Sequence, residues 1–208
     1  MTQNRVGIIN YGLGNIQSLS NALHFIGMDS LIISEPNQIS DCSHLILPGV
    51  GSFKVAMHAL DQNNLTSPLL GALNSGTPTL AICLGMQLLF QRSVEGGITN
   101  GLGFVSGEVS QLKVGNETKV PHTQWNRLYY HGNCKISKQI LENPLYYFTH
   151  SYAIYDAPHS KLDEFSLTEY GGSKFLSYAK VDNVMMCQFH PENSRENGLK
   201  LLKIFAGA

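Results

Sequence analysis

The chain has 208 residues, 43% of them hydrophobic and 14% charged, and its 14 basic and 15 acidic side chains give a formal net charge of −1. This length predicts a single domain covering residues 1–208, and the absence of a basic run argues against nucleic-acid binding. No apolar run approaches the roughly 20 residues that span a bilayer, and MTQNRVGIIN lacks the features of a secretory signal, so we expect a cytoplasmic protein that does not enter a membrane.

The first half of the sequence alternates between short apolar runs and amphipathic segments. Strands are predicted at residues 6–10, 30–34, 44–53 and 78–82. The third of these runs into a glycine-rich turn. Helices, in which apolar residues recur at helical spacing, are predicted at residues 15–27, 53–60, 64–74 and 84–93. Such alternation predicts parallel strands that are joined by right-handed crossovers.

The second half of the sequence differs from the first in residue pattern and composition. After Gly96, short alternating segments rich in β-branched and aromatic residues predict mainly antiparallel strands. The segment at 194–208 has apolar residues on one helical face and predicts a closing helix. The whole pattern predicts an α/β fold, with a central, mostly parallel sheet to which antiparallel strands are appended.

Cys83 lies at the predicted junction between the strand at 78–82 and the following helix. Ligands bind at the carboxyl ends of parallel strands, and the amino terminus of a helix favours a thiolate over a thiol. The sequence AICLG (81–85) has small residues two positions before and after the cysteine, as in the strained turn called a nucleophile elbow. On this local pattern alone, a small core cysteine is an equally good interpretation.

His190 and Glu192, in the segment CQFHPENS, supply a candidate base and its orienting group. His190 follows an apolar strand and precedes a proline, which predicts a position at the end of that strand. The carboxylate of Glu192 can hold the imidazole through a hydrogen bond, giving the arrangement of nucleophile, base and orienter. A lone histidine is more often a surface or packed residue, but its combination with Cys83 favours catalysis.

The segment LPGVGSF (47–53) brings two glycines to the end of another predicted strand. Backbone N–H groups can turn toward a ligand there because glycine has no Cβ. Together with the N–H of Leu84, they predict an oxyanion hole at the same edge of the sheet. The alternative is an ordinary glycine-rich turn.

The other cysteines, Cys42, Cys134 and Cys187, do not share this setting. Cys187 stands in an apolar run and is interpreted as a core residue. The spacings form no CxxC pair, so we expect reduced thiols.

The segments LPGVG, CLGMQLL and QFHPE occur here in the order and with the spacing of the class I, or triad, glutamine amidotransferases, which the chain resembles along essentially its whole length. Three more segments, NYGLGNIQSL, VPHTQWN and YYFTHSY, are similar to the family of glutaminase subunits of imidazole glycerol phosphate synthases. The resemblance implies a flavodoxin-like three-layer α/β sandwich and a glutaminase that uses no cofactor or metal ion.

In this family a cysteine attacks the side-chain amide of glutamine, which forms a thioester and releases ammonia. The resemblance implies that Cys83 is the nucleophile, that His190 transfers the protons and that Glu192 holds His190. It implies oxyanion stabilisation by the backbone of Val50, Gly51 and Leu84. Glutamine binding is carried over to Gln87, Thr149, His150, Ser151 and Tyr152.

The related synthases pass ammonia to a separate (β/α)₈-barrel cyclase subunit, which makes imidazole glycerol phosphate and aminoimidazole carboxamide ribotide in histidine biosynthesis. The resemblance therefore implies a heterodimer. A charged content of 14%, below the roughly 25% typical of soluble domains, agrees with a partner covering part of the surface. The residues carried over to the partner interface are Asn15, His122, Trp125, Asn126 and Asn193.

Three sites depart from the family's usual pattern. Thr123 and Gln124 precede Trp125-Asn126 where the family usually has Met-Gly. Asn193 stands where a lysine or arginine usually follows His-Pro-Glu, and this change removes one ion pair expected with the cyclase. Ala81 replaces the usual glycine of the elbow, a difference of one methyl group.

Three other functions are compatible with parts of this pattern. The leading interpretation is the glutaminase of histidine biosynthesis, and the departures at 124 and 193 give some weight to a paralogous glutaminase that supplies a cyclase-like partner for the amidination of surface sugars. Neighbouring genes would separate these two functions. A non-catalytic partner-binding module is opposed by the intact set of Cys83, His190 and Glu192. A stand-alone cysteine hydrolase, such as a peptidase, is opposed by the PHTQWN and FTHSY segments.

Overall fold

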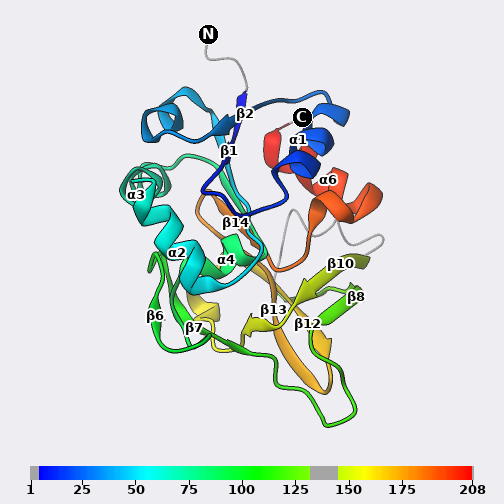
Figure 1. Cartoon of the computed structure of the whole chain (residues 1–208). Coiled ribbons are helices and arrows are strands. Elements are labelled where there is room, and N and C mark those ends of the chain that lie inside the picture. Colours follow the sequence, from blue (N-terminus) through cyan, green and yellow to red (C-terminus); the bar gives the residue numbers. More distant parts are fainter. Residues whose placement is uncertain (1–4, 132–144, 208) are drawn as a thin grey trace.

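A sheet of eight strands forms the centre of the chain, whose computed structural model describes residues 5–131 and 145–207 (Figure 1). In order across the sheet, the strands are β2 (Asp29–Ile33), β1 (Arg5–Ile9), β3 (His44–Leu47), β4 (Thr79–Ile82), β14 (Val184–Cys187), β13 (Ser173–Val181), β12 (Glu164–Tyr170) and β9 (Tyr129–His131). The first five pair in parallel, and the last three continue the sheet in antiparallel pairs. The predicted parallel core with appended antiparallel strands is confirmed.

Two smaller sheets are built from the middle of the sequence. One pairs β8 (His122–Arg127) with β10 (Leu145–His150) in antiparallel register, so that His122 lies opposite His150. The other contains β11 (Tyr152–Ile154), β7 (Val105–Gln111), β5 (Phe90–Ser93) and β6 (Thr99–Asn100). These sheets bring segments from the two halves of the sequence to the carboxyl edge of the parallel strands (Figure 1).

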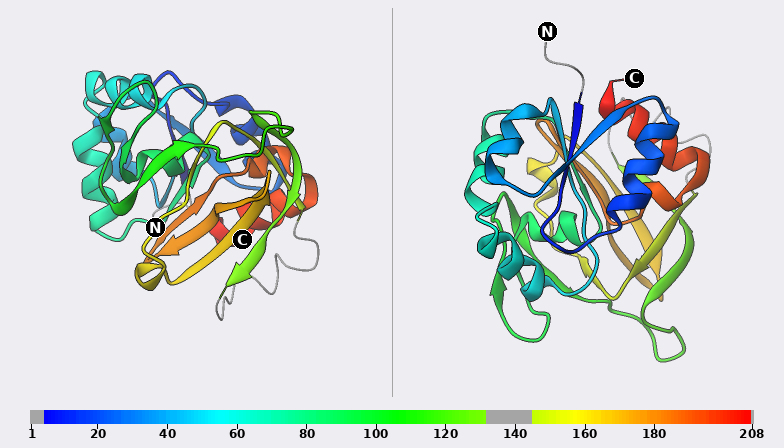
Figure 2. Two further views of the ribbon diagram at one scale, coloured as in Figure 1. Left: turned by 90° about the horizontal axis from the view of Figure 1, so that it is seen from below. Right: turned by 45° about the horizontal axis from the view of Figure 1, so that its top comes forward.

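Helices cover both faces of the central sheet, which gives three layers (Figure 2). On one side lie α1 (Ile16–Phe25) and α6 (Arg195–Ala206), and on the other lie α2 (Phe53–Gln62) and α3 (Thr66–Asn74). The shorter elements are α4 (Leu84–Leu88), η1 (Pro36–Asp41), η2 (His159–Lys161) and η3 (Pro191–Asn193). Within the described ranges, no helix has the length and apolar character needed to cross a membrane.

The parallel strands are buried on both faces, which explains why their sequences are continuous apolar runs. In β3, Leu45 and Leu47 pack into the core beneath α2 and α3, whereas Ile46 packs into the core beneath α1 and α6. Successive residues of a strand point to opposite faces, so a run such as HLIL contributes to two cores at once.

The predicted helix at 84–93 is wrong beyond residue 88. Its helical part, α4, ends at Leu88, and Phe90–Ser93 form β5. β5 pairs in parallel with β7 and antiparallel with β6. The MQLLF sequence has apolar residues at helical spacing, but pairing with partner residues 6 to 16 positions further on outweighs this local preference. The pairing of β5 with β7 is also parallel, in a half where antiparallel pairs predominate.

Candidate active site

Cys83 occupies a sharp turn between β4 and α4. Its backbone has φ 54° and ψ −110°, a left-handed φ that residues with a side chain rarely adopt. Strained conformations of this kind persist where the surrounding structure determines them, and they cluster at functional sites. The turn presents the sulfur at the carboxyl end of the parallel strands, which is the geometry of a nucleophile elbow.

The neighbouring glycines are required by close contacts between backbones. A Cβ added to Gly85 would lie 2.0 Å from the carbonyl oxygen of Leu47, at the end of β3. A Cβ added to Gly49 would lie 2.8 Å from the backbone nitrogen of Gly85. The glycine-rich loop after β3 therefore packs directly against the Cys83 turn, because neither backbone carries a side chain at the contact.

His190 and Glu192 form a buried pair at the end of β14. The Nδ1–H of His190 donates to Oε1 of Glu192 at 2.8 Å, and their side chains are 4% and 2% exposed. Burial lowers the pKa of His190, but the neighbouring Cys83 thiolate and the Glu192 carboxylate outweigh burial and raise that pKa above its ordinary value. The other ring nitrogen, Nε2, is buried without an oxygen or nitrogen partner, which leaves it free to exchange a proton with the sulfur.

Ser194 fastens the segment that carries this pair. Its hydroxyl donates to the carbonyl oxygen of His190 at 2.6 Å and accepts the N–H of Tyr147 in β10 at 3.0 Å. The N–H of His190 donates to the carbonyl oxygen of Tyr147 at 2.9 Å. Two of these hydrogen bonds hold the segment after β14 against β10, and the third is internal to the segment, so the imidazole has little freedom to move relative to the cavity wall.

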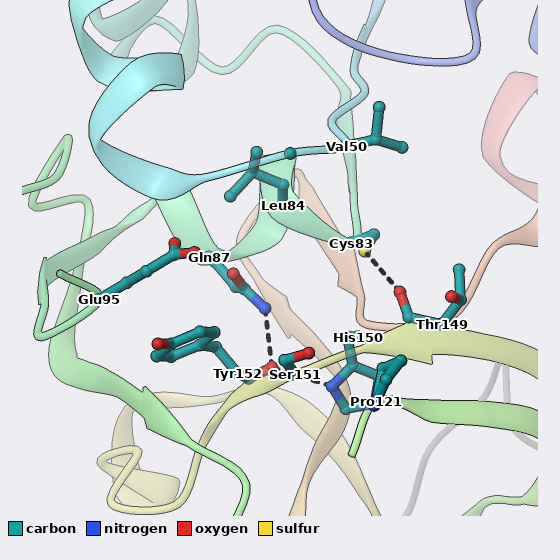
Figure 3. Close-up of a pocket in the computed structure, with 11 residues that line it drawn as sticks. Val50, Cys83, Leu84, Gln87, Glu95, Pro121, Thr149, His150, Ser151 and Tyr152 are labelled. Atoms are coloured by element: carbon teal, nitrogen blue, oxygen red, sulfur yellow. Dashed lines mark hydrogen bonds between the residues drawn. The ribbon is translucent and has the colours of Figure 1, made fainter.

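A cavity of about 370 Å³ opens beside the sulfur of Cys83 (Figure 3). The nine predicted residues that line it are Cys83, Val50, Gly51, Leu84, Gln87, Thr149, His150, Ser151 and Tyr152. Val50 and Leu84 lie on one side and the segment 149–152 on the other, with the sulfur 4.0 Å from the carbonyl oxygen of Thr149. The structure therefore gathers the expected nucleophile, the glycine loop and the expected substrate residues around one space.

Sequence reasoning missed two lining residues, Glu95 and Pro121. Glu95 is the one carboxylate among the lining residues, and its Oε2 accepts the N–H of Phe53 at 2.7 Å. A lone glutamate in the turn after β5 carries no motif in the sequence. Its place in the wall of the same cavity as Cys83 follows from the packing of β5 beside α4, which the predicted longer helix concealed.

Sequence reasoning also missed Gln188, which is fully buried beside Cys83. Its Nε2 donates to Sγ of Cys83 at 3.6 Å, and its Oε1 accepts from Nε2 of Gln87 at 2.9 Å. Gln87 also donates to the carbonyl oxygen of Tyr152 at 2.9 Å (Figure 3). A polar residue between two buried apolar ones, in the QFHPE segment, is the signal that could have singled it out.

His150 and His122 form a second buried pair, on β10 and β8. Nδ1 of His122 and Nε2 of His150 are 3.0 Å apart, and Nδ1–H of His150 donates to the carbonyl oxygen of Tyr152 at 2.9 Å. Burial lowers the pKa of His122 to about 4 and that of His150 to about 3, so both rings are neutral at pH 7. His150 lines the cavity, but both of its nitrogens are engaged within the protein.

The residues expected to contact a partner are not all at the surface. Asn15, Trp125 and Asn193 are exposed, and Asn126 is partly buried. The side chain of His122 does not reach the surface, because it is fully buried against Phe148 and Tyr170. The alternation of β8 directs this side chain inward, and one histidine after a proline does not reveal that direction.

The remaining surface candidates have local roles as well. Asn15 caps α1 by accepting the N–H of Ser18 at 3.3 Å. The guanidinium of Arg195 lies 5.4 Å from the ring centroid of Trp125. Trp125 is 39% exposed, which is unusual for so large an apolar side chain and leaves it available for contact.

Cys42, Cys83 and Cys187 are free thiols, and Cys134 lies outside the described residues. Cys187 is buried in the core, as expected. Within residues 5–131 and 145–207, no group of three or more His, Cys, Asp or Glu side chains is arranged to hold a metal ion.

Comparisons with known proteins agree with this geometry. Residues 8–206 match the family model described as glutamine amidotransferase class-I. The chain is 43% identical over 200 residues to imidazole glycerol phosphate synthase subunit HisH of Caldanaerobacter subterraneus subsp. tengcongensis, covering 96% of each chain. It is 41% identical over 202 residues to subunit HisH of Aquifex aeolicus, covering 97% of this chain and 95% of that one.

Among solved structures, PurLQS from Thermotoga maritima has the same fold, with a TM-score of 0.73 at 17% identity, covering 100% of this chain and 99% of that one. A structure described as a glutamine amidotransferase superimposes with a TM-score of 0.73 at 15% identity, covering 98% and 99%. The match over residues 8–206, together with relatives above 40% identity along almost the whole length, shows that the chain belongs to the class I glutamine amidotransferase family.

Proposed function

We propose that this chain is the glutaminase subunit of an imidazole glycerol phosphate synthase and that it hydrolyses glutamine to glutamate and ammonia. The observation that carries the proposal is the strained Cys83 turn beside the buried His190–Glu192 pair, at the wall of a cavity of about 370 Å³. Relatives named as subunit HisH, at 43% and 41% identity, support the same activity.

The first half of the reaction makes a thioester. Nε2 of His190 takes the thiol proton of Cys83, and the thiolate attacks the side-chain amide carbon of glutamine. A C–S bond forms while the carbonyl electron pair moves to oxygen. When that pair returns, the C–N bond breaks, His190 gives its proton to the nitrogen, and ammonia leaves. Glu192 stabilises the imidazolium that exists between the two proton transfers.

The second half of the reaction restores the enzyme. His190 removes a proton from water, and the resulting hydroxide attacks the thioester carbon. The C–S bond breaks, the sulfur leaves as a thiolate, and it recovers its proton from His190. One glutamine and one water have then become one glutamate and one ammonia.

The oxyanion of each tetrahedral intermediate needs N–H donors on the loop side of the cavity. The backbone of Val50, Gly51 and Leu84 is proposed to supply them, because all three residues line the cavity next to Cys83. Gly51 has φ +100°, a conformation that leaves its peptide groups free to face the substrate. Donors of this kind act on charge that develops in the transition state, and the loss of one costs about 10² to 10³ in rate.

Recognition of free glutamine requires a partner for each end of its zwitterion. The carboxylate of Glu95 is suited to the α-ammonium group, since it is the acidic side chain that lines the cavity. Gln87, Thr149, Ser151 and Tyr152 offer amide, hydroxyl and backbone groups for the rest of the substrate. His150 is proposed to shape this wall through its contact with Tyr152, because its ring nitrogens are already engaged.

The ammonia is proposed to pass to a separate (β/α)₈-barrel cyclase subunit in a cytoplasmic heterodimer. Asn15, Trp125, Asn126 and Asn193 are the proposed contact residues. A paralogous role with a cyclase-like partner in surface-sugar amidination is the second candidate, because Gln124 and Asn193 depart from the pattern of histidine-pathway subunits.

Glutamine hydrolysis by the purified chain, with and without the cyclase subunit and its nucleotide ligand, tests the proposal. We expect little activity alone and a stimulation of at least about 10-fold in the complex, the size of a typical coupling between sites. Formation of imidazole glycerol phosphate by the complex supports the histidine pathway over the sugar-modifying role. Hydrolysis that persists at the parental rate in Cys83→Ala would contradict the mechanism.

A further inference from the structure

We propose that Gln188 is a positioning residue for Cys83: its side-chain N–H donates to the sulfur, and the amide of Gln87 fixes the direction of that donation. The contact is the 3.6 Å separation between Nε2 of Gln188 and Sγ of Cys83. Gln188 is fully buried, so its amide has no access to water and must be satisfied by these neighbours. The inference deepens the proposed function, on which it rests for the role of the thiolate.

The direction of the Gln188 amide follows from a chain of contacts. The carbonyl oxygen of Tyr152 can only accept, so the group of Gln87 that lies 2.9 Å from it must be the NH₂. The same NH₂ lies 2.9 Å from Gln188, so the atom of Gln188 that faces it is the oxygen. The NH₂ of Gln188 is then left to face Cys83. Two amides in series therefore deliver an N–H, rather than an oxygen, to the sulfur.

The carbonyl of Tyr152 is itself held from the other side. Nδ1–H of His150 donates to it at 2.9 Å, so this oxygen accepts from both His150 and Gln87. Because Nδ1 of His150 must donate, its Nε2 accepts from Nδ1–H of His122, and Nε2 of His122 faces the NH₂ of Asn126 at 3.2 Å. Each contact has one permitted direction, which removes the ambiguity of amide and imidazole orientation.

Backbone pairing between β14 and β4 also places Gln188 next to Cys83. Cys187 in β14 pairs with Ile82 in β4, and the N–H of Cys83 donates to the carbonyl oxygen of Cys187 at 2.7 Å. The residue after each paired position is thus fixed relative to the other. An N–H donor stabilises a thiolate more than a thiol, because hydrogen bonds to charged groups are the stronger ones. A neutral amide achieves this without competing with His190 for the proton.

Other ionisable groups also face Cys83 and must be considered in a pH-based test. His190 is its proton partner, with Glu192 behind it. Tyr11, from the loop after β1, and Cys187, in the adjacent strand, interact with it electrostatically, and burial raises the pKa of both. Substitutions at position 188 leave all four groups in place, so a shift between variants reports on the lost N–H donor.

The test compares Gln188→Met with Gln188→Glu in the full chain. Methionine keeps the length and burial of the side chain but has no donor. Glutamate keeps an acceptor for Gln87 and puts an oxygen in place of the NH₂ that faces the sulfur. Alkylation of Cys83 by iodoacetamide is followed against pH, with the Cys83 peptide identified by mass spectrometry. We expect the pH midpoint to rise by about 1 unit in Gln188→Met and by more in Gln188→Glu.

The same variants are assayed for glutamine hydrolysis in the complex with the cyclase. We expect kcat to fall by about 10- to 100-fold, with KM for glutamine changed by less than about 3-fold. Ser177→Ala is the matched control. The carbonyl oxygen of Ser177 accepts the backbone N–H of Gln188, and the substitution removes only the buried hydroxyl of this neighbouring residue. It should lower stability while leaving the alkylation midpoint unchanged.

A midpoint within about 0.3 units of the parent in a folded Gln188 variant would overturn the positioning role. The parent chain offers a measurement that requires no change at position 188. The side-chain ¹⁵N resonance of Gln188 should titrate with the alkylation midpoint and stop doing so in Cys83→Ala; a resonance that does not move would also overturn the role. Lack of glutamine hydrolysis by the parental complex counts against the proposed function alone, because alkylation requires no substrate.

Discussion

Cys83 combines the proposed nucleophile with the most unusual backbone conformation at the site, and these two properties can be separated by substitution. Cys83→Ala and Cys83→Gly both remove the sulfur, so each should lower glutamine hydrolysis by at least about 10⁴-fold. Only glycine relieves the positive φ of 54°. We therefore expect Cys83→Gly to be more stable than Cys83→Ala by about 1 kcal/mol in urea unfolding.

Asn64 provides the control for this comparison, because it has a similar φ of 55° in the exposed turn between α2 and α3. Glycine at that position should also be more stable than alanine, with no effect on hydrolysis. Equal stability of the two Cys83 variants would show that the turn stores no strain. Retained hydrolysis in either of them would refute the nucleophile.

The packing of α6 against η3 holds Glu192 in place. A Cβ added to Gly198 in α6 would lie 1.7 Å from the carbonyl oxygen of Pro191, whereas one added to Gly71 in α3 would meet nothing within 4 Å. Both glycines are helical, so alanine gains about the same helix propensity, roughly 1 kcal/mol, at either position. The difference between the two variants therefore isolates packing.

We expect Gly71→Ala to stabilise the chain by up to about 1 kcal/mol and Gly198→Ala to destabilise it by about 2 kcal/mol. Denaturant titrations measure both. Displacement of η3 should also lower kcat in Gly198→Ala, since Glu192 lies in η3 and holds His190. A Gly198→Ala variant as stable and active as Gly71→Ala would show that α6 does not support the pair.

The two-stranded sheet of β8 and β10 should make stability depend on pH through its buried histidines. The pKa values of His122 and His150 are lowered from 6.5 to about 4 and about 3. Between those values and 6.5 the unfolded chain binds protons that the folded chain does not, so acidification favours unfolding. From pH 7 to pH 5 these pKa values correspond to a loss of about 2 kcal/mol for each ring, and so on the order of 4 kcal/mol for the pair.

His122→Gln tests this dependence because a glutamine can donate to His150 and accept from Asn126, as His122 does. Urea unfolding at pH 7 and pH 5 should show a smaller loss in His122→Gln than in the parent. An exposed histidine replaced in the same way, His58→Gln, should leave the loss unchanged. A loss that is identical in all three chains would assign the acid sensitivity elsewhere.

For the molecule as a whole, the proposed partner should cover the carboxyl edge of the parallel strands and not the opposite edge. Trp125 is 39% exposed beside the site, and Phe25 is 77% exposed at the far end of α1, which runs back toward the amino edge. We expect Trp125→Ala to weaken binding of the cyclase by at least about 10-fold, as a buried aromatic contact does. Isothermal titration calorimetry with the cyclase subunit measures the change.

Phe25→Ala is the control, because it removes a more exposed aromatic side chain from the other edge. It should change the affinity by less than about 2-fold. If Phe25→Ala weakens binding and Trp125→Ala does not, the partner sits on the opposite edge. In that event the expected contacts of Asn15 and Asn193 would have to be abandoned together with that of Trp125.

Short contiguous sequence patterns made several features predictable. These are the strand–helix alternation and the positions of Cys83, His190 and the glycine loop. The end of α4 was not predictable, since the pairing of Phe90–Ser93 with β7 joins residues that are distant in sequence. The role of Gln188 was not predicted for the same reason: its hydrogen-bond partner Gln87 is 101 positions away. Local patterns reveal chemistry at a turn, whereas the side chains that orient that chemistry come from other elements.

The Cys83 turn lies where the two hydrophobic cores of the molecule meet. Cys83 packs into the core beneath α1 and α6, and Leu84, the next residue, packs into the core beneath α2 and α3. Adjacent residues of one strained turn are thus held by layers on opposite faces of the sheet. Loosening of either layer would be transmitted to the sulfur, so substitutions that restore activity to a damaged chain are expected in both layers, far from the cavity.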